Sequence, residues 1–68
     1  MSNREELPID EDKAERIVEF VSEHEPVQRS FVKDQLKYDR STTNVILNEL
    51  LFRNRLQTKP DWRIETKE

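Results

Sequence analysis

The segment YDRSTTNVILNEL, residues 38–50, holds the densest group of side chains suited to binding a ligand. A guanidinium, two hydroxyls and two carboxamides occur there, at Arg40, Ser41, Thr42, Asn44 and Asn48. These groups form hydrogen bonds, but without an activated nucleophile or base they break no covalent bond. The only histidine, His24, has no neighbouring His or Cys. We therefore expect a binding segment, with neither a catalytic site nor a metal site.

Composition excludes several classes of protein. The 68 residues suffice for one small domain with a single compact core. Cysteine is absent, which excludes disulfides and thiolate-bound zinc and favours a cytoplasmic protein over a small secreted one. Glycine is absent too, which excludes glycine-rich phosphate loops, and no apolar run approaches the roughly 20 residues of a membrane span. We expect no cofactor, no small-molecule ligand and no membrane contact.

Charge is unevenly distributed along the chain, although the net charge is only −3. Residues 1–26 hold nine acidic and three basic side chains, whereas residues 27–68 hold nine basic and six acidic ones. Such asymmetry is typical of a molecule with one side that faces an anion. A solvated surface with chance clustering explains the same counts, so charge alone does not decide.

A first helix is predicted at about 11–24, after a polar arm formed by residues 1–8. Asp10 stands at the N-cap position, where its carboxylate can accept a backbone N–H. The glutamates on one side of this helix are four apart and are expected to face water. Pro26 ends the helix, because the residue before a proline is disfavoured in the α region. Apolar residues at helical spacing form its core face: Ala14, Ile17, Val18 and Val21, flanked by Phe20.

Two more helices are predicted at about 28–37 and 40–53. The earlier one has two apolar rows, Val32 with Leu36 and Val27 with Phe31. Asp39 is expected to cap the later one by accepting backbone N–H bonds from the helix's first turn, at Ser41 or Thr42. Asn54 is expected to end it, because asparagine tolerates the left-handed conformation. The core face of helix 40–53 consists of Thr43, Ile46, Leu47, Leu50 and Leu51.

The residues at about 55–66 predict a two-stranded β-hairpin. Leu56 and Thr58 precede the turn sequence Lys59-Pro60-Asp61, and alternation resumes with Trp62, Ile64 and Thr66. Trp62 is expected to pack the hairpin onto a helix, with an exposed contact as the alternative. Residues 9–66 thus predict one α+β domain that is mainly α.

Three helices and a terminal hairpin, in this order, resemble the winged helix-turn-helix domains of prokaryotic transcription regulators. The most specific part is VKDQLKYDRSTTNVILNELLFRNRL, residues 32–56. It is similar to the family's pattern of spaced apolar residues, a turn, a cap, and Arg-Ser-Thr before two leucines. Lys37 and Asn54 replace glycines of that pattern and Lys33 replaces a small residue, so Lys37 is expected at positive φ or in an altered turn. The apolar positions are Val32, Leu36, Tyr38, Leu47, Leu50 and Leu56.

The resemblance implies a transcription regulator whose partner is double-stranded DNA, with helix 40–53 lying in the major groove. Arginine pairs with guanine, asparagine pairs with adenine, valine contacts the thymine methyl group, and hydroxyls suit a phosphate. The protein is then expected in the cytoplasm, associated with the nucleoid of a prokaryote or with a viral genome. The residues of this helix expected at the DNA are Arg40, Ser41, Thr42, Asn44, Val45 and Asn48.

The same resemblance makes the hairpin the wing, which lies along the phosphate backbone. Lys59 and Arg63 flank its tip, and Arg53 and Arg55 lead into it. Each phosphate that such a cation neutralises adds to the salt dependence of binding. The acidic helix 11–24 is expected to face away from the DNA.

Other interpretations stay open. Asn and Thr on a helix are often only a solvated surface, and Arg40 has neighbouring aspartates as alternative partners. Val45 and Phe52, seven positions apart on the outward side, suit instead a winged-helix module that binds another protein. Phe52 has the further alternative of packing under the hairpin against Trp62. A homodimer would use Phe20 or Phe52, and a monomer is the alternative.

Overall fold

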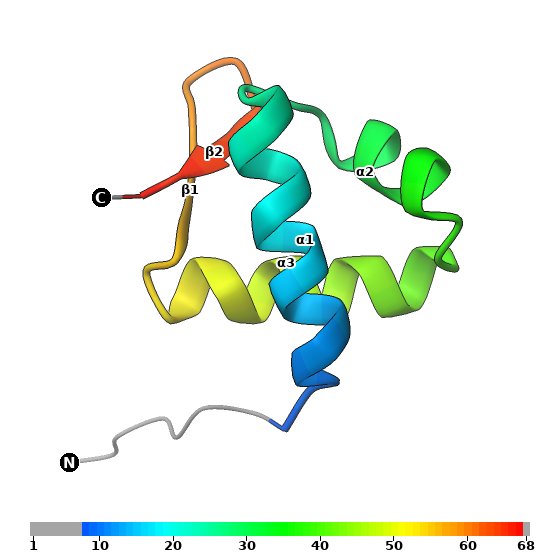
Figure 1. The fold of residues 1–68 in the computed structure, drawn as a ribbon. Coiled ribbons are helices and arrows are strands. Elements are labelled where there is room, and N and C mark those ends of the chain that lie inside the picture. The colour runs from blue at the N-terminus through cyan, green and yellow to red at the C-terminus, as the bar shows by residue number, and fades with distance from the viewer. Residues whose placement is uncertain (1–7, 68) are drawn as a thin grey trace, which may run out of the picture.

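The computed structural model describes residues 8–67 and contains three helices followed by an antiparallel hairpin (Figure 1). The helices are α1 (Glu11–His24), α2 (Arg29–Leu36) and α3 (Arg40–Phe52), and the strands are β1 (Leu56–Thr58) and β2 (Ile64–Thr66). The predicted fold class, mainly α with a C-terminal hairpin, is confirmed. Most of the predicted N-terminal arm lies outside the described residues. Within residues 8–67, no helix is both long enough and apolar enough to cross a membrane.

Helix α1 begins and ends where its capping chemistry predicts. Asp10 is the N-cap, and its Oδ1 accepts a hydrogen bond from the Lys13 backbone N–H at 3.2 Å. The helix stops before Glu25, whose extended backbone (φ −59°, ψ 145°) precedes Pro26 in a cis peptide bond. The predicted core face is confirmed: Ala14, Ile17 and Val21 are buried, while Val18 and Phe20 are half-buried.

The turn between α2 and α3 contains one confirmed prediction and one error. Lys37 is left-handed (φ 60°), as expected where a chain without glycine ends a helix. Asp39 occupies the N-cap of α3, but its side chain accepts no capping N–H bond from the helix. Its carboxylate is engaged by hydroxyls instead: Thr42 is the main cause of its lowered pKa, and Ser41 Oγ donates to it at 3.4 Å.

The hydrophobic core draws on all three helices, both strands and the segment before α2. Val27, predicted to form a row with Phe31 on the second helix, instead pairs with β2: its N–H donates to the Ile64 carbonyl at 2.9 Å and its carbonyl accepts from the Ile64 N–H at 2.6 Å. Phe31 is 41% exposed. The buried apolar residues are Ala14, Ile17, Val21, Val27, Val32, Ile46, Leu47, Leu50, Leu56 and Ile64.

The hairpin is shorter than predicted, and its second strand starts at Ile64 instead of Trp62. Leu56 pairs with Thr66, and Thr58 pairs with Ile64. The Trp62 N–H donates to the Lys59 carbonyl at 2.8 Å to close the turn, which places Trp62 in the left-handed region (φ 70°). Trp62 is 81% exposed, so the prediction that it packs the hairpin onto a helix is wrong.

Glu25 fastens the segment before α2 to the last strand. Its Oε1 accepts hydrogen bonds from both the backbone N–H and the hydroxyl of Thr66, each at 2.7 Å. Because both bonds favour the ionised carboxylate, they lower the pKa of Glu25, the backbone bond having the larger effect.

These bonds predict a contribution of Glu25 to acid sensitivity. With the folded-state pKa lowered, the unfolded chain binds more protons in this range, so stability falls as pH drops below about 4.3, the usual glutamate pKa. We expect Glu25→Gln to lose stability at pH 7 and to show a shallower decline between pH 5 and 3. Urea unfolding at several pH values measures both quantities. Glu23→Gln, an exposed neighbour on α1, is the control, and parallel curves for Glu25→Gln and the wild type would contradict the prediction.

Candidate nucleic-acid interface

The outward side of α3 carries the polar residues singled out from the sequence. Ile46, Leu47 and Leu50 are buried beneath it. Thr43, predicted on the core face, is buried too, with its hydroxyl donating to the Asp39 carbonyl at 2.9 Å. The candidate residues remain at the surface: Arg40, Ser41, Val45 and Asn48 are exposed, and Thr42 and Asn44 are half-buried. The side chains that sequence reasoning placed on one side of a helix therefore share that side in the fold.

A hollow lies between α2 and the N-terminal half of α3. Its lining brings together three cationic side chains with hydroxyls and one carboxamide, from Arg29, Ser30, Lys33, Arg40, Thr43 and Asn44. Sequence reasoning missed Lys33 of α2 as a member of this site, and it missed Arg29 and Ser30 as well. The positions of Arg29 and Ser30 in the first turn of α2 carry no signal by themselves, since only the packing of α2 on α3 brings them to the candidate helix.

The two arginines of this hollow form no ion pair within residues 8–67, unlike the arginines near the hairpin. Arg29 Nη2 donates to Asn48 Oδ1 at 3.0 Å, across 19 positions of sequence. Arg40 forms no ion pair with Asp34, Asp39 or any other acid within residues 8–67, and Lys33 pairs with Asp34 at 2.9 Å. The hollow thus holds two guanidinium groups whose charge no carboxylate in the described part of the chain neutralises.

The cations at the hairpin tip have acidic partners. Arg63 Nε donates to Asp61 Oδ2 at 2.7 Å, and this bond raises the pKa of Arg63 and lowers that of Asp61. Lys59 Nζ lies 3.6 Å from Glu65 Oε1. The charge at the tip is consequently weaker than the count of basic residues predicts, although these pairs are solvent-exposed and open to exchange of partners.

Arg53 and Arg55, the two basic residues that precede the predicted wing, form ion pairs with acidic residues of the helices. Arg53 Nε pairs with the buried Glu49 at 3.1 Å, and its Nη1 donates to both oxygens of Glu11 at 3.2 Å. Arg55 Nη1 donates to Glu15 Oε2 at 2.8 Å, which lowers the pKa of Glu15. These two arginines connect the end of α3 and the start of β1 to α1.

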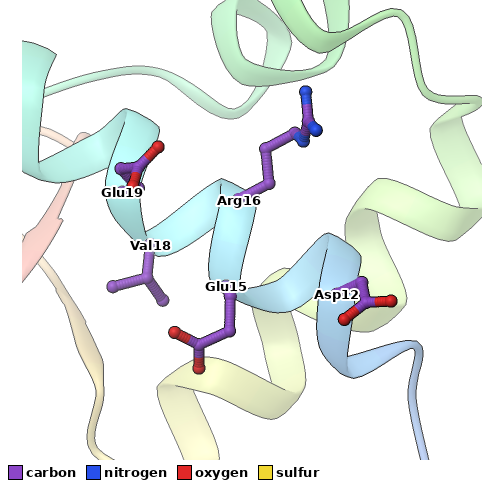
Figure 2. Close-up of a pocket in the computed structure, with 5 residues that line it drawn as sticks. All are labelled: Asp12, Glu15, Arg16, Val18 and Glu19. Atoms are coloured by element: carbon purple, nitrogen blue, oxygen red, sulfur yellow. The ribbon is translucent and has the colours of Figure 1, made fainter.

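The exposed side of α1 is acidic. Figure 2 shows five side chains that line a shallow hollow there, with Glu15 and Arg16 leaving the helix in opposite directions. Three of the five are acids and one is a base: the lining consists of Asp12, Glu15, Arg16, Val18 and Glu19. A surface of this composition repels a polyanion, so the side of the molecule suited to one is that of α2 and α3.

Apolar side chains are exposed at three places. Val45 and Phe52 of α3 are 52% and 38% exposed. Phe31 of α2 is 41% exposed, and the half-buried Phe20, a predicted partner contact, lies 5.6 Å from its ring and stacks on His24 with ring centroids 4.3 Å apart. Trp62 is exposed at the hairpin turn, so the alternative in which it packs with Phe52 under the hairpin is wrong.

Comparisons of the chain with protein-family models, with curated proteins and with solved structures give no match. The topology of the chain is therefore the only basis for relating it to a known fold. Three helices followed by a C-terminal antiparallel hairpin that packs on α1 form a topology consistent with a winged helix-turn-helix.

Proposed function

We propose that this chain is a small winged helix-turn-helix domain that binds double-stranded DNA and regulates transcription in a prokaryote or virus. The observation that carries the proposal is the open side of α3, where Arg40, Asn44 and Asn48 lie at the surface beside the cation-lined hollow. A helix of this kind fits the major groove, with its N-terminal half toward the base edges.

The chemistry of each part suits a position on a duplex. Arg40, at the first position of α3 and without an ion pair within residues 8–67, is placed for a guanine edge or a phosphate. The hydroxyls of Ser41 and Thr42, which bond the Asp39 carboxylate in the free protein, exchange that carboxylate for a phosphate at the helix N-terminus, where a phosphate is favoured. Val45, 52% exposed, presents methyl groups to the major groove.

The hairpin serves as the wing. Lys59 and Arg63 exchange their carboxylate partners for phosphates, a substitution that costs little because both pairs are exposed. Trp62 adds an aromatic surface at the tip that the fold leaves uncovered. The acidic side of α1 faces away from the duplex.

A duplex titration tests this proposal. We expect binding of a mixed-sequence 20-base-pair duplex that weakens from 50 to 200 mM salt, because each neutralised phosphate releases counterions. Arg40→Ala is expected to weaken binding about tenfold, as one lost specific arginine contact does. Fluorescence anisotropy measures both effects.

Arg16→Ala is the matched control for that titration, since Arg16 lies on the acidic side of α1 and its loss should leave the affinity unchanged. Equal affinities for Arg40→Ala and Arg16→Ala, or an affinity that does not depend on salt, would refute DNA binding through α3.

The second candidate function is a winged-helix module that binds protein. The observations that favour it are the partial exposure of Val45 and Phe52 on one side of α3 and a net charge of −3, with an isoelectric point of about 5.2. Domains that bind nucleic acid are more often basic. A wild-type domain that binds no duplex at low salt would favour this second function.

A further inference from the structure

The hydrogen bond between Arg29 and Asn48 determines which groups this part of the surface offers to a ligand. Arg29, in the first turn of α2, directs Nη2 at Asn48 Oδ1, in the middle of α3, over 3.0 Å. A guanidinium carries only donors, so the carboxamide can accept this bond only through its oxygen. The orientation of the Asn48 amide is therefore fixed, and its NH₂ group points away from Arg29.

This orientation changes the base that Asn48 suits. Reading adenine requires an asparagine oxygen that accepts from N6 and an amide nitrogen that donates to N7. With its oxygen held against a cation, Asn48 offers its NH₂ group, and the N–H groups of Arg29 that are not bound to Asn48 are donors too. The Asn48 oxygen keeps a second lone pair, but that oxygen already faces the Arg29 cation, so the groups that the pair offers to a ligand are mainly donors.

The surroundings of the pair extend this donor character. The hollow that Arg29 lines also includes Ser30, Lys33, Arg40 and Asn44, and no acidic side chain lines it. The nearest acid on α2, Asp34, is bound to Lys33 at 2.9 Å. The three cationic side chains of this hollow only donate hydrogen bonds, so a ligand that fills it is expected to supply acceptors to them.

We propose that Arg29 and Asn48 act as one recognition unit that selects guanine in the major groove. Guanine is the base whose major-groove edge offers two acceptors, N7 and O6, and no donor. This inference rests on the proposed function and adds a specificity to it: a target containing guanine at the position facing the middle of α3. Arg40, from the same hollow, takes the neighbouring phosphate.

The test compares duplexes that differ in one acceptor. Three 20-base-pair duplexes of equal charge are titrated at constant salt: one rich in G·C pairs, the same one with every guanine replaced by 7-deazaguanine, and one of A·T pairs only. The 7-deaza base keeps Watson–Crick pairing but lacks the N7 acceptor. We expect the wild type to lose about tenfold in affinity on the 7-deaza duplex and a similar factor on the A·T duplex.

Variants assign the discrimination to the pair. Arg29→Met is expected to bind the normal and 7-deaza duplexes equally, and Arg29→Lys, which keeps the charge but loses the planar fork, is expected to lose most of the discrimination while it nearly retains the wild-type affinity for the 7-deaza duplex. Arg55→Met is the matched control: it removes the same charge from an arginine bound to Glu15 on the α1 side and should keep the discrimination. Circular dichroism melting confirms that each variant folds.

The outcomes distinguish guanine selection by this pair from DNA binding as such. Wild-type protein that binds the normal and 7-deaza duplexes equally well overturns guanine selection and leaves DNA binding intact. Discrimination that persists in both Arg29 variants overturns the role of the pair in the same way. Failure to bind any duplex overturns the proposed function and this inference together.

Discussion

Arg53→Ala is expected to lower the free energy of unfolding by about 3 kcal/mol, because it takes a guanidinium partner from a buried carboxylate. Glu49 is buried on α3, and the Arg53 side chain that pairs with it is only 12% exposed. Total stability for a chain of this length is roughly 3–10 kcal/mol. The substitution therefore removes about a third or more of the stability.

Urea unfolding followed by circular dichroism measures this effect, and two variants identify its cause. Glu11→Gln removes only the exposed carboxylate that Arg53 also contacts, and should cost less than about 1 kcal/mol. Replacing both members of the buried pair, in Glu49→Leu/Arg53→Leu, should recover most of the stability, since apolar side chains of similar volume then take the place of the two buried charges. Arg53→Ala as stable as Glu11→Gln would show that the pair does not govern the stability of this end of α3.

Trp62→Gly is expected to change stability and DNA binding in opposite directions. A side chain at φ 70° is strained, and glycine relieves that strain, so the free energy of unfolding should rise by about 1 kcal/mol. The same change removes the exposed ring from the wing tip and should weaken duplex binding roughly tenfold, because the apolar area that the ring would bury against the duplex is lost. Urea unfolding and fluorescence anisotropy on the same samples measure the two effects.

Two further substitutions separate strain from contact at the wing tip. Trp62→Ala keeps a Cβ atom at the strained position and loses the ring, so it should bind DNA as weakly as Trp62→Gly without the gain in stability. Lys37→Gly relieves the equivalent strain between α2 and α3, and should be more stable than the wild type with unchanged DNA affinity. Normal binding by Trp62→Gly would remove the ring from the proposed interface.

Local patterns explain which features could be predicted from the sequence. The N-cap at Asp10, the stop before Pro26 and the left-handed residues Lys37 and Asn54 each depend on a few neighbouring positions, and all four are confirmed. The apolar faces of α1 and α3 follow from helical periodicity in the same way. Asn44 and Asn48, four positions apart, lie on one outward face of α3 for the same reason.

Features that depend on long-range packing could not be predicted from the sequence. The exchange of backbone bonds between Val27 and Ile64, and the ion pairs of Arg53 and Arg55 with α1, join residues about 40 positions apart. No spacing rule marks Arg29 as a neighbour of Asn48 for the same reason. The prediction for Trp62 was wrong for a different reason. The alternation of apolar and polar residues placed Trp62 in the second strand, whereas the structure places it in the turn.

The Val27–Ile64 bridge and the Glu25–Thr66 hydrogen bonds also bear on how the domain forms during translation. Both depend on residues near the C-terminal end of the domain, so a nascent chain that has exposed only its helices still lacks the strand that packs on α1. Completion of the fold must wait until residue 66 has left the ribosomal exit tunnel. Until then the helices leave apolar surface open to chaperones and proteases.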